Sequence, residues 1–98
     1  MPDRMKLMEL ARKYPRNVSF GGERTTLLLP EGTKQYSSQK EYETEYNHHI
    51  ESAKRAESKG DLASRFYHRT IADAIVRDRR QVSPESKKLC YEFYKAKY

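Results

Sequence analysis

The residue type best suited to chemistry in this sequence is arginine, which occurs five times between residues 65 and 80. The surrounding stretch, SRFYHRTIADAIVRDRRQ, has the periodicity of an amphipathic helix. At about 100° per residue, Arg69, Arg80 and Arg77 lie about 40°, 60° and 120° from Arg65, opposite the apolar stripe. A planar guanidinium donates paired hydrogen bonds and so suits phosphate recognition. The stretch therefore predicts a phosphate-binding face, to which the N-terminal segment adds Arg12, Lys13 and Arg16.

The same arginines fit a second interpretation, namely the solvated side of an ordinary surface helix. Asp73 stands four residues before Arg77, and this spacing allows an ion pair within the helix. Such a pair would lower the charge that is left for a partner. Both interpretations stay open from the sequence alone, and in both the arginines face away from the core.

A second candidate surface lies on the last predicted helix, where tyrosines recur. Leu89, Phe93 and Ala96 fall within a narrow arc that predicts the core side. The opposite arc holds a lysine and three tyrosines, Lys87, Tyr91, Tyr94 and Tyr98. Tyrosine is enriched at protein interfaces because its ring is apolar while its hydroxyl tolerates water. This arc therefore predicts either a protein-binding face or a second buried layer beneath the N-terminal segment.

Metal and nucleophilic chemistry have less support in the sequence. Glu45 and His48 have the Glu-x-x-His spacing of di-iron helical bundles, but such a site needs a second motif and two further glutamates. We expect His48 to form a surface ion pair with Glu41 and Glu45, and His49 to border the apolar stripe. Cys90 falls in mid-helix, away from the helix N-termini that favour thiolates, and predicts a buried thiol. We therefore expect no metal, no cofactor and no catalytic residue, and hence no enzyme.

The composition limits the class of protein. The chain has 98 residues, enough for one domain, and its 36% apolar and 35% charged residues predict a thin core. Further stability from a partner or from homodimerisation is thus an expectation. A single cysteine excludes a disulfide within the chain. Because no apolar run resembles a signal peptide or a membrane span, an intracellular, cytoplasmic protein without a membrane partner is predicted.

Periodicity and turn signals predict a mainly α fold (α+β) in one domain over residues 1–98. In the 1–36 unit, a helix over 2–14 ends before Pro15, and a β-hairpin turns at Gly21-Gly22. This unit is predicted to pack on a three-helix antiparallel bundle over residues 37–98.

The three helices of the bundle have clear start and stop signals. Ser38 begins a capping box and Gly60 is a natural stop, so the first of them spans about 39–59. Asp61 caps the next, which runs to about Arg80, and Ser83 caps the last, which runs to the C-terminus. The apolar stripe of the first helix is predicted to be Tyr42, Tyr46, Ile50, Ala53 and Ala56.

Charge is distributed unevenly around a net value of +6. Residues 1–40, 41–61 and 62–98 carry net charges of +4, −3 and +5. An acidic helix between two basic segments favours docking and leaves basic surface for an acidic partner. The sequence thus predicts a small basic binding protein that associates with nucleic acid, a nucleoprotein complex or an acidic protein surface through its arginine-rich face. The alternative is an adaptor or inhibitor that binds a target protein through the tyrosine face.

Overall fold

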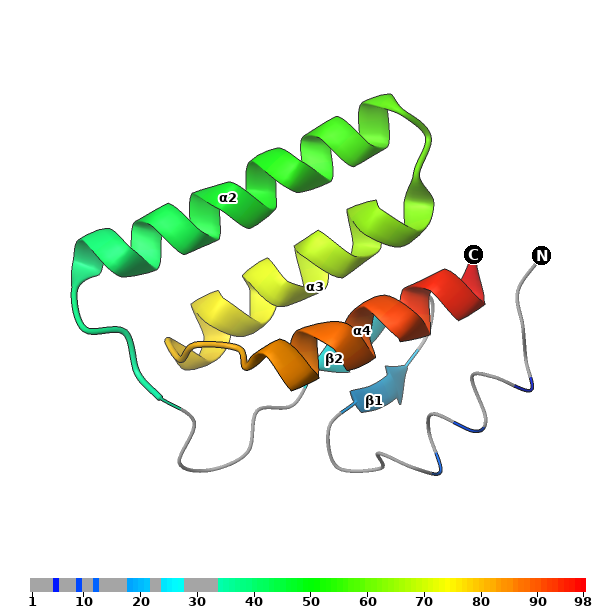
Figure 1. Ribbon diagram of the computed structural model, residues 1–98, viewed down its shortest axis with the longest axis horizontal. Coiled ribbons are helices and arrows are strands. Elements are labelled where there is room, and N and C mark those ends of the chain that lie inside the picture. The colour runs from blue at the N-terminus through cyan, green and yellow to red at the C-terminus, as the bar shows by residue number, and fades with distance from the viewer. Residues whose placement is uncertain (1–4, 6–8, 10–11, 13–17, 22–23, 28–33) are drawn as a thin grey trace.

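Three packed helices dominate the computed structural model (Figure 1). It describes residues 5, 9, 12, 18–21, 24–27 and 34–98. Helix α2 spans Gln39–Ser58, α3 spans Leu62–Asp78 and α4 spans Pro84–Lys97. Helix α3 is central because it packs against both α2 and α4. The predicted helical bundle is therefore confirmed.

The N-terminal segment contributes two short strands, β1 (Val18–Gly21) and β2 (Arg24–Leu27). They pair antiparallel, with Val18 opposite Leu27 and Gly21 opposite Arg24. Most of the predicted helix over 2–14 lies outside the described residues. The packing of this N-terminal unit on the bundle stays a prediction.

Side-chain and backbone caps fix the ends of the helices. Ser38, Asp61 and Ser83 each accept a hydrogen bond from the backbone N–H three residues later, over 3.1, 3.1 and 3.2 Å. Gly60 follows α2 with a φ of +72°, a left-handed conformation that L side chains rarely adopt. Pro84 occupies the first turn of α4, where a missing N–H costs no helical bond. These starts and this stop agree with the sequence signals.

The end of α3 differs from the prediction. The helix was expected to reach Arg80, but it ends at Asp78 because Arg79 adopts a left-handed conformation (φ 52°, ψ 38°). The Arg79 N–H still donates to the Ile75 carbonyl over 2.8 Å and so closes the last turn. Arg80 then leaves the helix and forms an isolated β-bridge with Gln35. The physical reason is that the chain must reverse direction before α4, and Arg79 makes that turn.

The core lies between α3 and α4. Its largest fully buried side chains are Ile71 and Ile75 from α3 and Phe93 and Tyr94 from α4. Leu89 is 5% exposed, which together with Phe93 confirms the predicted core positions of this helix. The buried Cys90 thiol has its pKa raised to about 12 by burial, which keeps it protonated and unreactive.

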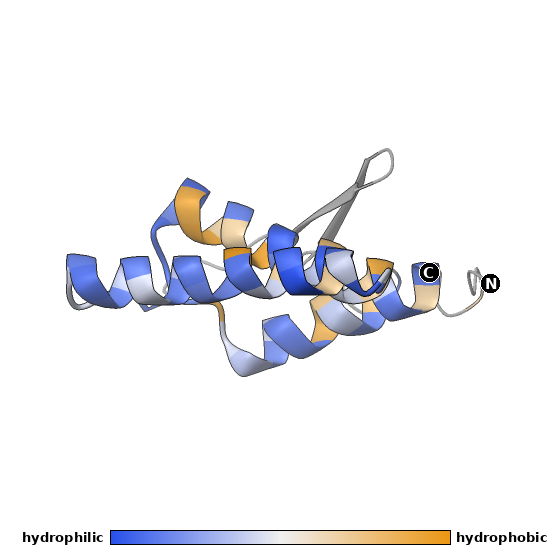
Figure 2. Ribbon diagram, turned by 90° about the horizontal axis from the view of Figure 1, so that it is seen from above, coloured by the Kyte–Doolittle hydropathy of each residue, from blue (hydrophilic) through white to orange (hydrophobic). Residues whose placement is uncertain are grey.

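Polar residues cover the outer surface of the bundle. In Figure 2, where α2 lies nearest the viewer, this helix is mostly in hydrophilic colours. Its buried residues are only His49, Ala53 and Ala56, which form one narrow contact stripe. Within the described part of the chain, no helix is both long enough and apolar enough to cross a membrane.

Tyr94 was predicted on the side of α4 opposite the core, and this position is wrong. The residue is 0% exposed. Its hydroxyl forms a buried hydrogen bond with the Thr70 hydroxyl over 2.5 Å, and its ring stacks on Phe66 at 5.9 Å. The buried positions of α4 are Ser86, Leu89, Cys90, Phe93 and Tyr94. Because this pattern repeats at i, i+3, i+4, i+7 and i+8, it makes a broad core face that is rotated from the predicted arc.

Truncation of the α4 core should separate apolar packing from the buried hydrogen bond. Phe93→Ala is expected to lower the free energy of unfolding by about 3–5 kcal/mol, because it removes a fully buried aromatic ring. Tyr94→Phe keeps the ring and removes only the hydrogen bond to Thr70, so a loss of about 1–3 kcal/mol is expected. Urea unfolding measures both, with the exposed Lys88→Ala as control. A Tyr94→Phe variant as stable as the wild type would contradict the role of the Thr70 bond.

Candidate nucleic-acid interface

Two of the predicted arginines meet at the surface between α3 and α2. Arg65 and Arg69 lie one turn apart on α3, and their side chains keep 42% and 54% of their surface exposed. Arg80 does not share this face, because the helix ends before it. Arg77 holds Asp78 in two hydrogen bonds of 3.0 and 2.6 Å. The predicted four-arginine face is therefore reduced to the Arg65–Arg69 pair.

A groove runs along the contact between α2 and α3 beside this pair. Its volume is about 400 Å³. The basic groove is lined by Ile50, Ala53, Lys54, Glu57, Arg65, Phe66 and Arg69. Three of these seven side chains are cationic and one is anionic, so the lining carries net positive charge. Lys54 comes from the helix that the sequence shows to be acidic, and its role depends on the packing of α2 against α3.

The acidic residues near the groove hold the two arginines only loosely. The Arg65 guanidinium lies 3.8 Å from Glu57 across the helix pair, and the Arg69 guanidinium lies 3.7 Å from Asp73 one turn along α3. Both separations exceed hydrogen-bond length, and all four side chains are well exposed. Exposed ion pairs of this kind contribute about 0–1 kcal/mol. A phosphate can therefore replace either carboxylate at little cost. The predicted pair of Asp73 with Arg77 stays a prediction.

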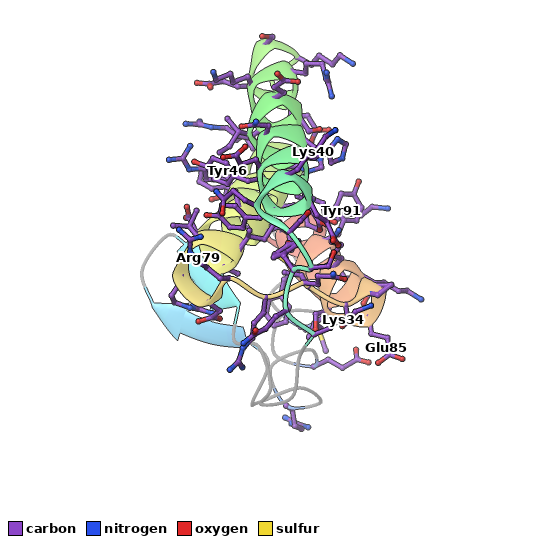
Figure 3. The ribbon with its side chains drawn as sticks, turned by 90° about the vertical axis from the view of Figure 1, so that its left-hand side faces the viewer. Lys34, Lys40, Tyr46, Arg79, Glu85 and Tyr91 are labelled. Carbon is purple, nitrogen blue, oxygen red and sulfur yellow. The ribbon has the colours of Figure 1, made fainter. Side chains whose placement is uncertain are left out.

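An aromatic pair, Tyr42 and Tyr46, continues the same side of α2 beyond the groove. Their rings are nearly parallel, with centroids 6.3 Å apart and planes inclined by 5°. The Arg79 guanidinium lies 4.8 Å from the centre of the Tyr42 ring. Figure 3 shows Tyr46 and Arg79 on one side of the α2–α3 pair, and Lys40 and Tyr91 on the other. Both tyrosines were predicted to face the core, and both pack against it while part of each residue stays exposed.

A second aromatic contact lies at the other end of the groove. Phe66, which lines the groove, stacks on Tyr98 with centroids 5.1 Å apart and planes inclined by 8°. The Arg65 guanidinium lies 5.4 Å from the centre of the Phe66 ring. Tyr98 is 39% exposed. A guanidinium therefore lies beside an aromatic ring at each end of the groove.

The other residues singled out from the sequence are placed elsewhere. Tyr91 is 39% exposed and packs edge-on against Tyr67 at 5.3 Å. Lys87 forms a 3.0 Å ion pair with Glu45, so this lysine joins α4 to α2. With Tyr94 buried, the predicted tyrosine face keeps only Tyr91 and Tyr98 at the surface. Of the N-terminal cations, Arg12 is exposed, while Lys13 and Arg16 lie outside the described residues.

A histidine pair lies inside the contact between α2 and α3. His49 is 2% exposed, and its Nδ1 lies 3.0 Å from Nδ1 of His68. One of these nitrogens must donate while the other accepts, so the pair requires at least one neutral ring. Burial lowers the pKa of His49 to about 3, and repulsion from Lys87 and His68 acts in the same direction. Sequence spacing missed this pair because the two residues are brought together only by helix packing.

The surface ion pair predicted for His48 is replaced by other contacts of the same glutamates. Glu45 binds Lys87, and its carboxylate lies 4.0 Å from His49 Nε2. Glu41 accepts a hydrogen bond from the Gln81 side-chain amide over 2.8 Å. Among the described residues, no group of three or more His, Cys, Asp or Glu side chains is arranged to hold a metal ion.

Comparison with known proteins adds no relative: the chain matches no protein-family model, no curated protein and no solved structure. The residues of the α2–α3 surface are therefore the basis for any functional assignment.

The histidine pair predicts a loss of stability in acid. His49 has a lowered pKa in the folded chain, about 3 against an ordinary value of 6.5. The pKa of His68 is also lowered, chiefly by burial. As the pH falls below 6.5, the unfolded chain therefore takes up protons that the folded chain resists. Each such histidine lowers the free energy of unfolding by at most about 1.4 kcal/mol per pH unit.

Urea unfolding between about pH 4.5 and 7.5, which spans the ordinary histidine pKa, measures this effect. His49→Leu removes the buried titrating ring and should flatten the decline. His48→Gln, at an exposed position of the same helix, is the matched control. Equal acid sensitivity in the His49→Leu variant and the wild type would contradict the role of the buried pair.

Proposed function

We propose that the protein is a small, non-catalytic nucleic-acid-binding protein that holds phosphate groups in the basic groove. The observation that carries this proposal is the convergence of Lys54, Arg65 and Arg69, from two helices, on one groove. Arginine and lysine supply most protein contacts to nucleic-acid phosphates. Three such groups on neighbouring turns can bind successive phosphates of one strand.

The charge balance around the groove supports the same function. The chain carries a net charge of +6, which attracts polyanions over distances beyond direct contact. The ion pairs to Glu57 and Asp73 are long and solvent-exposed. A phosphodiester carries one negative charge and two free acceptor oxygens, so a guanidinium can bind it through paired hydrogen bonds in place of these distant carboxylates. Binding would also release counterions from the nucleic acid, which adds a favourable entropy.

We further propose that the N-terminal helix and β-hairpin pack on the bundle within a single domain. In that arrangement Arg12, Lys13 and Arg16 add positive charge to the nucleic-acid-binding surface. The protein-binding alternative has less support, since Tyr94 lies in the core and Lys87 is paired with Glu45. Tyr91 and Tyr98 alone make a small surface for a partner protein.

The proposal predicts salt-dependent binding that depends on the two groove arginines. For the wild type, the logarithm of the binding constant should fall linearly with the logarithm of salt concentration. The double variant Arg65→Ala/Arg69→Ala should bind more weakly, and its slope should be shallower by about 1.4–1.8, because it neutralises two fewer phosphates. Fluorescence anisotropy with labelled oligonucleotides measures both.

Two further variants make this test specific. Arg77→Ala removes one positive charge, as Arg65→Ala or Arg69→Ala alone does, but its guanidinium is bound to Asp78, so it should weaken binding less than either of these single substitutions. Glu57→Gln removes the carboxylate opposed to Arg65 and should strengthen binding. Binding that ignores salt, or an Arg65→Ala/Arg69→Ala variant that binds like the wild type, would rule the proposal out.

A further inference from the structure

We infer that the α2–α3 surface prefers single-stranded over duplex nucleic acid, because it places aromatic rings for base stacking beside the phosphate-binding groups. This inference rests on the proposed function and specifies its ligand. It goes beyond phosphate binding, which the two forms of nucleic acid share. The groups that carry it are the aromatic pair and the Arg79 guanidinium.

The first step is that the aromatic pair lies close to the cationic side chains of the basic groove. Tyr46, Ile50 and Lys54 follow one another at four-residue spacing on α2, and Ile50 and Lys54 line the basic groove. An α-helix rises about 1.5 Å per residue, so the Tyr46 and Lys54 positions are about 12 Å apart along the axis. A strand whose phosphates lie in the groove therefore passes close to the aromatic pair.

The second step concerns the aromatic surfaces themselves. Tyr42 and Tyr46 are half-buried and nearly parallel, and the Arg79 guanidinium lies over Tyr42. At the other end of the groove, the Phe66 ring is stacked between Tyr98 at 5.1 Å and Tyr94 at 5.9 Å, so it is engaged within the protein. Aromatic rings and guanidinium planes are the groups on which unpaired bases stack, each contributing about 1–3 kcal/mol per base. The aromatic pair therefore supplies the stacking surface, at one end of the phosphate-binding groups.

The third step is that a duplex fits this surface poorly. Arg65 and Arg69 lie beside α2, so α3 cannot enter a groove of DNA without its neighbour. Two helices side by side are about 20 Å wide, whereas the major groove of B-form DNA is about 12 Å wide. A duplex also keeps the faces of its bases stacked inside, away from the tyrosines. It can therefore offer this surface only its backbone phosphates.

Fluorescence anisotropy with three matched probes tests the inference. The probes are a single strand of about 12 nucleotides, within the range that single-strand binding folds cover, the duplex of the same sequence, and an abasic strand of the same length. The single strand is expected to bind at least about 10-fold more tightly than the abasic strand or the duplex, which corresponds to about 1.4 kcal/mol. The abasic probe needs no substitution in the protein, so the result does not depend on a variant that folds.

Substitutions then assign the stacking to particular rings. Tyr46→Ala should weaken binding of the single strand by about 5- to 150-fold, which is the contribution of one stacked base. Its affinity for the abasic strand should equal that of the wild type. Tyr46→Phe keeps the ring and should restore the affinity. Tyr91→Ala, on the opposite side in Figure 3, is the matched control and should bind all three probes like the wild type. Circular dichroism checks that each variant is folded.

The outcomes separate this inference from the proposed function. Salt-dependent binding that is equal for the single strand, the abasic strand and the duplex would overturn base stacking while phosphate binding remains. Absence of binding to all three probes would overturn both. A single-strand preference that survives Tyr46→Ala would overturn the assignment to the aromatic pair.

Discussion

Burial of α3 on two sides is the constraint on which the rest of the structure depends. Its apolar side chains Ile71 and Ile75 are fully buried, and α2 and α4 pack on either flank. The bond between Thr70 and Tyr94 ties α3 to α4 within the core, where an unpaired hydroxyl would cost about 1–3 kcal/mol. What remains exposed on α3 is a strip beside α2, and Arg65 and Arg69 lie on it. The location of the proposed binding surface is thus a consequence of core packing.

Electrostatic contacts join the helices without neutralising that surface. Glu45 of α2 binds Lys87 of α4 at 3.0 Å, and Glu57 lies 3.8 Å from Arg65 of α3. The first contact is short and partly buried, whereas the second is long and exposed. The difference follows from position, because only the Glu57 side of α2 opens onto the basic groove. Helix α2 therefore binds α4 through the Glu45–Lys87 ion pair. On its other side, the Glu57–Arg65 contact is weak enough for another anion to replace Glu57.

The histidine pair makes the stability of the contact between α2 and α3 depend on pH. His49 of α2, the helix that also carries Lys54 and the aromatic pair, shares one hydrogen bond with His68 of α3. Because a buried imidazolium is strongly disfavoured, the contact between these helices is strongest when both rings are neutral. Proposed binding through the α2–α3 surface requires this contact, so stability and binding share one physical basis.

The amino-acid sequence by itself determined the helices of the bundle and most of their ends. Ser38, Gly60, Asp61 and Ser83 act locally, through hydrogen bonds and backbone conformations within a few residues, and such effects can be read from spacing. The core positions of Leu89 and Phe93 followed from periodicity for the same reason. The sequence also indicated that an arginine-bearing side of α3 would face away from the core.

Only the tertiary structure decided which residues share a surface. Tyr94 was misplaced because aromatic residues occur all around α4, so the rotation of the helix depends on what α3 offers to it. Arg80 was misplaced because the turn at Arg79 is set by the reversal of the chain into α4. The histidine pair forms, and Lys54 lies beside Arg65 and Arg69 in one groove, only because α2 and α3 pack side by side. The physical reason is that periodicity defines the faces of one helix, while contacts between helices decide which faces meet.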